Sequence, residues 1–188
     1  MSSIAIAGDT SGSVTLAAPA VAGSTTQTLV NVSGTLAPLV SGTAVASTSG
    51  TSIDFISIPS WVKRITVMFS GVSASGTSLV QIQLGNGSFQ TTGYTSCAAS
   101  DASKNTSTTG ILAVANGFAT STIFGSIQFN LIGSNIWVAS GVTNRVVVEQ
   151  NAFIAGGVTL SGVLDRVRIT TVNGTDTFDA GTINIMYE

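Results

Sequence analysis

The acidic side chains are the residues of this sequence best suited to acid–base or metal chemistry. The 188-residue chain has no histidine, which removes the commonest general base and a usual zinc ligand. Paired carboxylates act together in glycosidases, and Asp176 and Asp179 are close together in NGTDTFDAGT. A calcium loop usually supplies more oxygen ligands. We therefore expect both side chains to cap backbone groups of the turn before the last strand, with a metal site as the alternative.

The other reactive residue types also indicate structure. Asp165 adjoins Arg166 in LDRVRI, and Arg168 follows on the same face of a predicted strand, so a cross-strand ion pair is the simplest interpretation. The single cysteine, Cys97, excludes an intrachain disulfide and has no basic neighbour to activate it. Without histidine, Ser-His-Asp and Cys-His arrangements cannot form within one chain. The sequence predicts a protein that is not an enzyme, with no catalytic, cofactor-binding or metal-binding residues.

Two tryptophans and two prolines are the candidate residues for assembly contacts. Trp61, in PSWVKR, stands at the entrance of a predicted strand, and we expect it to be a core or rim anchor. Trp137, in SNIWVAS, follows a predicted turn and has the better case for exposure. Stacking of a sugar on either ring is a second hypothesis. Pro19 and Pro38 interrupt the first part of the chain and complete the set of candidates.

The composition favours a folded chain that associates with other chains. Hydrophobic residues make up 44% of the sequence, charged residues only 7%, and the net charge is −2. About a quarter of residues are charged in a typical domain, and a sparsely charged surface near neutrality promotes association. We therefore expect a subunit of an oligomer. The alternative is a secreted β-domain that Ser and Thr hydroxyls keep in solution.

The composition also argues against two classes of partner. Six Lys and Arg residues without a run lack the electrostatic footprint of nucleic-acid binding. Polar residues interrupt every apolar stretch before it reaches the roughly 18 residues of a membrane span. The first residues, MSSIAIAGDTSG, do not have the pattern of a signal peptide. We expect synthesis in a cytoplasm, and no binding to nucleic acid or membrane.

Short strands are the elements that would position these residues. Residues 1–48 are expected to form an extended N-terminal arm for assembly contacts, since alone they bury too little surface to fold. The β-prone pieces of this arm are Ser3–Ala7, Ser13–Ala17 and Thr26–Ser33. The arm either adds strands to a neighbouring subunit or supplies a pair of edge strands to its own domain.

Residues 49–188 are expected to form a β-sandwich. Alternating apolar residues between turn residues predict its strands, at Ser52–Ile58, Val62–Phe69, Leu79–Leu84, Gly110–Ala115, Phe124–Ile132, Asn135–Ser140, Arg145–Ile154, Val158–Leu160, Arg166–Val172 and Thr182–Tyr187. Turns are predicted at 141–144 and 156–157, and a long exposed loop at 88–109 with a short helical turn near 96–102 as an option. The sequence predicts an all-β fold, an antiparallel sandwich of jelly-roll type.

Three segments resemble structural proteins of phage particles. They are AGDTSGSVTLAAPAVAGSTT (7–26), GTSIDFISIPSWVKRITVMFSGVSASGTS (50–78) and LDRVRITTVNGTDTFDAGTINIMYE (164–188). The last of these is the most specific, and residues 88–160 do not share the resemblance. Proteins with similar segments are often identified as tail-fibre or other virion proteins. The resemblance implies a virion β-sandwich, often trimeric, and supplies no catalytic residues.

The resemblance leaves two placements on the particle open. A homotrimer on the virion surface, made in the host cytoplasm, is either a capsid decoration protein or a tail-fibre tip. A decoration protein would bridge capsid subunits with its arm, and a receptor-binding tip would present loops to host glycans. No coiled-coil or collagen-like shaft is visible in the sequence, which favours decoration. A bacterial lectin-like adhesin is the third class and would need secretion.

Overall fold

The chain divides into two compact units, Met1–Leu36 and Ala37–Glu188. The computed structural model describes residues 3–7, 13–17, 37–117, 119–146 and 150–188. In the first unit, β1 (Ser3–Ala7) pairs antiparallel with β2 (Ser13–Ala17). The strand expected at 26–33 and the candidate contact residue Pro19 lie outside the described residues.

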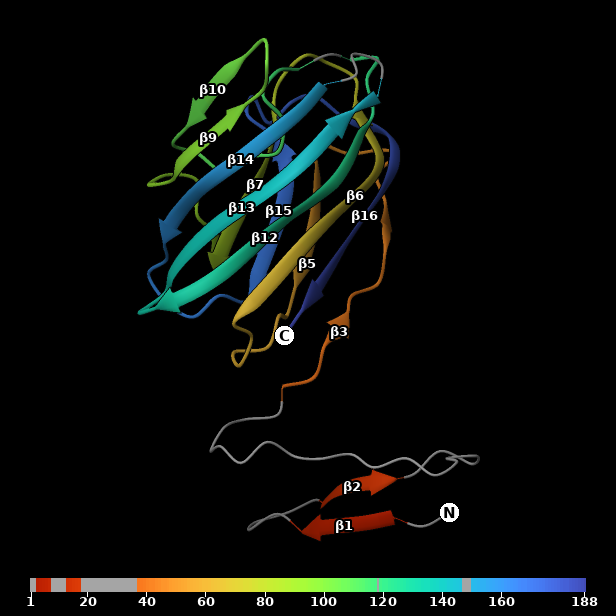
Figure 1. The fold of residues 1–188 in the computed structure, drawn as a ribbon, viewed down its shortest axis with the longest axis vertical. Helices are drawn as coiled ribbons and strands as arrows, with labels where there is room; N and C mark the ends of the chain where they lie inside the picture. Colours follow the sequence, from red (N-terminus) through yellow and green to blue (C-terminus); the bar gives the residue numbers. More distant parts are fainter. Residues whose placement is uncertain (1–2, 8–12, 18–36, 118, 147–149) are drawn as a thin grey trace. The chain divides into compact units, whose positions relative to one another are not determined.

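The second unit is a sandwich of two antiparallel sheets (Figure 1). The larger sheet has nine strands, in the order β10 (Lys104–Ser107), β9 (Thr95–Ala99), β14 (Gln150–Thr159), β13 (Ile136–Arg145), β12 (Ile123–Gly133), β6 (Arg64–Ala74) and β16 (Phe178–Tyr187), with the short β3 (Val40–Ser41) and β4 (Val45–Ala46) beside β16. The smaller sheet has five strands, β11 (Ile111–Leu112), β7 (Val80–Asn86), β15 (Arg166–Thr171) and β5 (Ser52–Ile56), with β8 (Ser88–Phe89) beside β7. The predicted antiparallel sandwich is confirmed.

The strand pairs join the early part of this unit to its late part. β4 pairs with β16, β5 with β15, β6 with β12 and β7 with β11. Two further ladders, β6 with β16 and β7 with β15, connect these pairs within each sheet. Because β3 and β4 lie along β16, the unit begins at Ala37, ahead of the boundary at residue 49 that the sequence suggested.

Residues of alternating orientation build one core between the sheets. In β6, Ile65, Val67 and Phe69 are buried, whereas the residues between them point away from the core. Ile82 of β7 and Ile169 of β15 join the same core from the smaller sheet, whose strands lie behind the larger sheet in Figure 1. Successive residues of a strand point to opposite faces, so the period-two pattern of the sequence fixes which side chains face the core.

The long exposed loop predicted at 88–109 is wrong, as is the helical turn near 96–102. This stretch contains β8, β9 and β10, and β9 pairs with both β14 and β10. Tyr94 is 2% exposed, and its hydroxyl accepts a hydrogen bond from the Leu84 N–H (2.7 Å) and donates one to the Leu84 carbonyl (3.2 Å). β11 pairs only with Gln81 and Ile82. Leu84 lies beyond the end of β11, so the Tyr94 hydroxyl makes backbone hydrogen bonds with Leu84 that β11 does not supply.

The turns predicted at 141–144 and 156–157 are also wrong, because these residues lie inside β13 and β14. Gly141 sits between Ile127 of β12 and Ile154 of β14 in the ladder. A Cβ atom at Gly141 would collide with the carbonyl oxygen of Ser126. Glycine is needed here for the close approach of two strands, and a single sequence does not distinguish that need from a turn.

We expect Tyr94→Phe to lower the free energy of unfolding by about 1–3 kcal/mol, because the buried Leu84 N–H loses its acceptor. Burial raises the pKa of Tyr94 from 10.0 to about 12, against the opposing effect of its hydrogen bond with Leu84. The folded state therefore holds this proton more tightly than the unfolded state. The resulting stabilisation is complete below pH 10 and is lost as the pH rises from about 10 towards 12.

Urea unfolding of the unaltered protein and of Tyr94→Phe across this pH range measures the difference in the free energy of unfolding. The matched control is Tyr187→Phe, since the Tyr187 hydroxyl makes no hydrogen bond to the residues that the structure describes. The control should change stability little. Equal losses in the two variants would contradict the role given to the Tyr94 hydroxyl.

Candidate assembly surface

The outer face of the larger sheet points away from the core and is covered by no strand of the second unit. Along β13 the buried residues include Trp137 and Thr143, and the intervening positions are exposed. Val138 and Val142 are among these outward residues, with 37% and 47% of their surface exposed. Because the alternation leaves apolar side chains on the solvent side, this face does not have the polar outer side usual in sandwiches.

The register of the strands gathers the outward apolar residues into rows. Val142 of β13 lies opposite Phe153 of β14, which lies opposite Ala99 of β9. Phe153 is 60% exposed, although a phenylalanine is usually buried. The next row carries Ala155 of β14 opposite Cys97 of β9. Side chains directly opposite each other are in contact distance, so the rows form a continuous patch of apolar and small residues.

The three central strands of this face carry no charged outward side chain among their described residues. Their outward positions are Phe124, Ser126, Gln128, Asn130 and Ile132 of β12, Ile136, Val138, Ser140, Val142 and Asn144 of β13, and Asn151, Phe153, Ala155, Gly157 and Thr159 of β14. Charges stand at the borders, where Arg64 of β6 forms an ion pair with Glu188 and Lys104 occupies the edge strand β10. Seven of these fifteen outward positions are apolar, and depletion of charge with exposed aromatic and aliphatic side chains is typical of a protein interface.

Trp137 is buried, so the exposure expected from the sequence is wrong. The turn before β13 needs only two residues, Ser134 and Asn135, with φ of 47° and 62°. The strand begins at Ile136, which is outward, and the next residue points into the core, where it is 2% exposed. Its indole Nε1 has no hydrogen-bond partner among the described residues. Trp137 is therefore a core residue and does not contribute its ring to a surface.

Trp61 lies at the rim of the sandwich, just before β6. It is 39% exposed, and its ring lies 5.9 Å from that of Tyr187 at an interplanar angle of 50°. Pro38 is exposed in the segment before β3. Trp61 and Pro38 are therefore exposed, whereas Trp137 lies in the core, so the three do not form one surface site. The sequence does not reveal the apolar rows of β13 and β14, because glycine and asparagine in these segments predict turns.

The acidic residues serve the local structure. Asp176 accepts a hydrogen bond from the Ser78 N–H (2.9 Å), in the neighbouring turn, and Asp179 accepts one from the Ser73 hydroxyl. Asp165 and Arg166 form an ion pair, and the hydrogen bond from Arg166 holds the pKa of Asp165 below its usual value. Within the described residues, no group of three or more potential ligands is placed to hold a metal ion.

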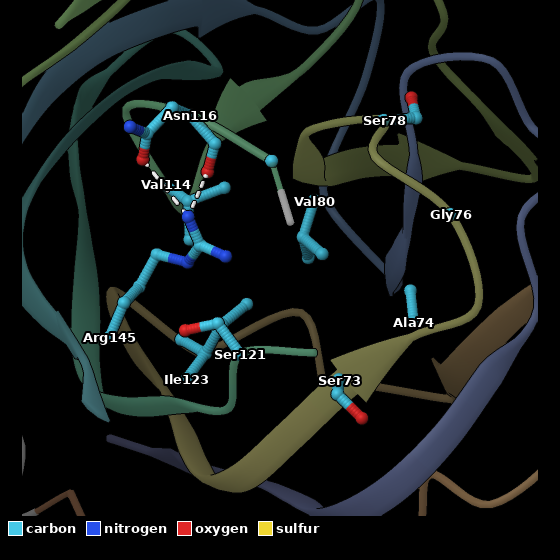
Figure 2. A pocket seen from close by; sticks show the side chains of 11 residues that line it. Ser73, Ala74, Gly76, Ser78, Val80, Val114, Asn116, Ser121, Ile123 and Arg145 are labelled. Atoms are coloured by element: carbon cyan, nitrogen blue, oxygen red, sulfur yellow. Dashed lines mark hydrogen bonds between the residues drawn. The ribbon is translucent and has the colours of Figure 1, made fainter. Parts of the chain in front are cut away.

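Figure 2 shows the cavity around Arg145, which is lined by polar side chains but is too small for a ligand. Arg145 is 3% exposed, and its Nη1 donates to the carbonyl oxygen (2.8 Å) and the side-chain oxygen (3.0 Å) of Asn116. Burial lowers the pKa of this guanidinium. Ser121 also lines the cavity, whose volume of about 20 Å³ corresponds to one water molecule. The contacts anchor the segment around Asn116 to β13.

No known protein family, curated protein or solved structure matches this chain. Among the described residues, no helix is long and apolar enough to cross a membrane.

The contrasting burial of the two tryptophans predicts a difference in fluorescence. A Trp61→Phe protein, with Trp137 as its only indole, should emit at short wavelength and resist acrylamide quenching, since a buried ring is shielded from water. A Trp137→Phe protein, with only Trp61, should emit at longer wavelength and be quenched several-fold more. Equal quenching of the two folded proteins would contradict the placement of Trp137 in the core.

Proposed function

We propose that this protein is a non-enzymatic structural protein of a phage particle, a capsid decoration protein that assembles as a homotrimer on the virion surface. The observation that carries the proposal is the outer face of β12, β13 and β14, which exposes large apolar side chains such as Phe153 and Val142 and is charged only at its borders. Such a face is poorly suited to permanent contact with water. Its burial between subunits stabilises an assembly through the hydrophobic effect.

The pairing of early with late strands supports a jelly-roll topology. Eight strands pair in nested fashion: β4 with β16, β5 with β15, β6 with β12 and β7 with β11. They form one long antiparallel ribbon that is rolled into two sheets, and the hairpins of β9–β10 and β13–β14 extend it. Jelly rolls are frequent in viral capsid proteins, which fits the resemblance of the terminal segments to virion proteins.

A second copy of the chain is the occupant that we propose for this face. Binding of a different protein is usually guided by complementary charges, and the centre of this face offers none. Contacts between identical subunits are more apolar than contacts between independent proteins. Three copies around a closed axis can bury the face without leaving an open end, and the trimer is the state that the resemblance to virion proteins implies.

The self-association can be tested with Phe153→Lys, which places a charge in the apolar row opposite Val142. We expect the unaltered protein to have the mass of a trimer in light scattering. The variant should weaken association by at least about 30-fold, as for a residue that contributes about 2 kcal/mol to an interface.

The control is Val163→Lys, which alters an equally exposed residue (55%) outside the strands. It should leave the mass unchanged. A monomeric unaltered protein, or a Phe153→Lys trimer of undiminished stability, would refute assembly through this face.

The placement on the particle has its own test. An affinity tag on the protein, visualised in purified particles by electron microscopy, should label the head at hundreds of positions. Label confined to the tail, in a few copies, would show a fibre or receptor-binding tip instead. Absence of the protein from purified particles would refute the virion proposal altogether.

A further inference from the structure

The outer face of the smaller sheet carries a groove that the assembly of the larger sheet does not use. It has a volume of about 310 Å³ and is lined by polar residues of β5, β7 and β15 and of the segments beside them. Ser52, Gln81, Gln83, Thr109, Arg168 and Thr170 are the residues on which its chemistry depends. The volume lies at the lower end of the range of small-ligand sites, which is about 300–1,000 Å³.

Two glutamine side chains lie at the base of the groove. Gln81 is 2% exposed and Gln83 is 5% exposed. Gln81 Oε1 accepts a hydrogen bond from the Thr109 hydroxyl (2.9 Å), and Gln83 Nε2 donates to the Thr109 carbonyl (2.9 Å). Gln81 Nε2 and Gln83 Oε1 have no partner among the described residues, although both side chains line the groove. Neither atom is among the fully buried atoms without a partner, so both are open to the groove, where a ligand can replace the water that they bind.

The positive charge of Arg168 in the groove is neutralised by Asp54. Arg168 donates from Nε (2.8 Å) and Nη2 (2.7 Å) to the two carboxylate oxygens of Asp54, its cross-strand neighbour. This hydrogen bonding raises the pKa of Arg168, and the guanidinium lies 4.0 Å from the ring centroid of Phe89. A bidentate, stacked arginine is held in one orientation. The pair therefore adds rigid polar atoms to the groove without a net charge that would select an anion.

The hydroxyl groups of the wall are also oriented. The Thr170 hydroxyl donates to the Thr51 carbonyl (2.8 Å), and the Thr109 hydroxyl donates to Gln81. Each hydroxyl has one hydrogen to donate and further lone pairs to accept with. Because their hydrogens are committed, these hydroxyls can only accept hydrogen bonds from a ligand. The groove thus presents fixed acceptors, together with the amide donor of Gln81 and the N–H groups of Arg168 that Asp54 does not bind.

We propose that this groove binds a neutral saccharide of one or two sugar units. Sugar hydroxyls donate and accept hydrogen bonds at once, which matches an uncharged lining of amides and threonine hydroxyls. A nucleotide or other phosphate would need an unpaired cation, and an apolar peptide side chain would need a hydrophobic pocket. The saccharide site lies on the smaller sheet, so it goes beyond the assembly role and does not depend on it.

Saturation-transfer NMR and calorimetry with the full chain test the proposal, using a panel of neutral hexoses, N-acetylhexosamines and their disaccharides. At least one member should bind, and a glucuronate or a sugar phosphate of the same size should bind no better. Gln83→Met, which keeps the length of the side chain and removes both polar groups, should weaken binding at least tenfold.

Gln83→Met also removes a hydrogen bond to Thr109, so a second variant is needed that leaves the fold intact. Thr91 is an exposed residue at the groove, and Thr91→Trp should fill it and abolish binding. Its neighbour Thr92 is equally exposed and does not line the groove, so Thr92→Trp is the matched control and should bind normally. Thermal unfolding verifies that both proteins are folded.

Three results would overturn the proposal: no binding by any neutral sugar up to its solubility limit, binding that Thr91→Trp leaves unchanged, or a clear preference for the acidic probes. A monomeric unaltered protein would refute the assembly proposal and leave these measurements valid, because Phe153 lies on the larger sheet and the groove lies on the smaller one.

Discussion

The antiparallel pairing of β6 with β16 holds the sandwich together, because it joins its first long strand to its last. Ile65 lies opposite Tyr187 at one end of this ladder, and Ala74 lies opposite Phe178 at the other. Near its middle the backbones approach so closely that a Cβ atom at Gly181 would collide with Gly71. Both glycines have positive φ, 92° and 67°, and the register shifts on either side of Ala180. Bulges of this kind increase the local twist of a sheet.

The side chains that the two outer faces present depend on the β6–β16 pairing and on the alternation within each strand. On the larger sheet the outward positions hold apolar residues such as Val142 and Phe153, which favour contact with another surface. On the smaller sheet they hold Gln81, Gln83 and the Arg168–Asp54 pair, which favour a polar ligand. One sandwich therefore presents two chemically different sides, and three ion pairs, Arg64–Glu188, Arg166–Asp165 and Arg168–Asp54, form among its described residues.

Local pattern in the sequence predicts the strands that have clear alternation, such as β5, β7 and β15, and the sandwich that they imply. It does not predict the end of a strand where contacts with residues far away in the sequence determine that end. Gly141 permits the close approach of two strands. Trp137 enters the core because the turn before its strand is only two residues long. Gln81 and Gln83 look like outward polar residues, and only the folded segment around Thr109 covers them. Contacts between residues far apart in sequence decide these cases.

The nested pairing of strands has a consequence for how the molecule is made. β4 and β6 both pair with β16, the last strand of the sandwich, so neither ladder can form until residues far along the chain are available. Folds dominated by such distant pairings fold slowly, within milliseconds to seconds. During that interval the unpaired strand edges and the apolar residues of β12 to β14 are open to other chains. The apolar rows of β13 and β14 are thus segments at which aggregation can begin before the sandwich closes.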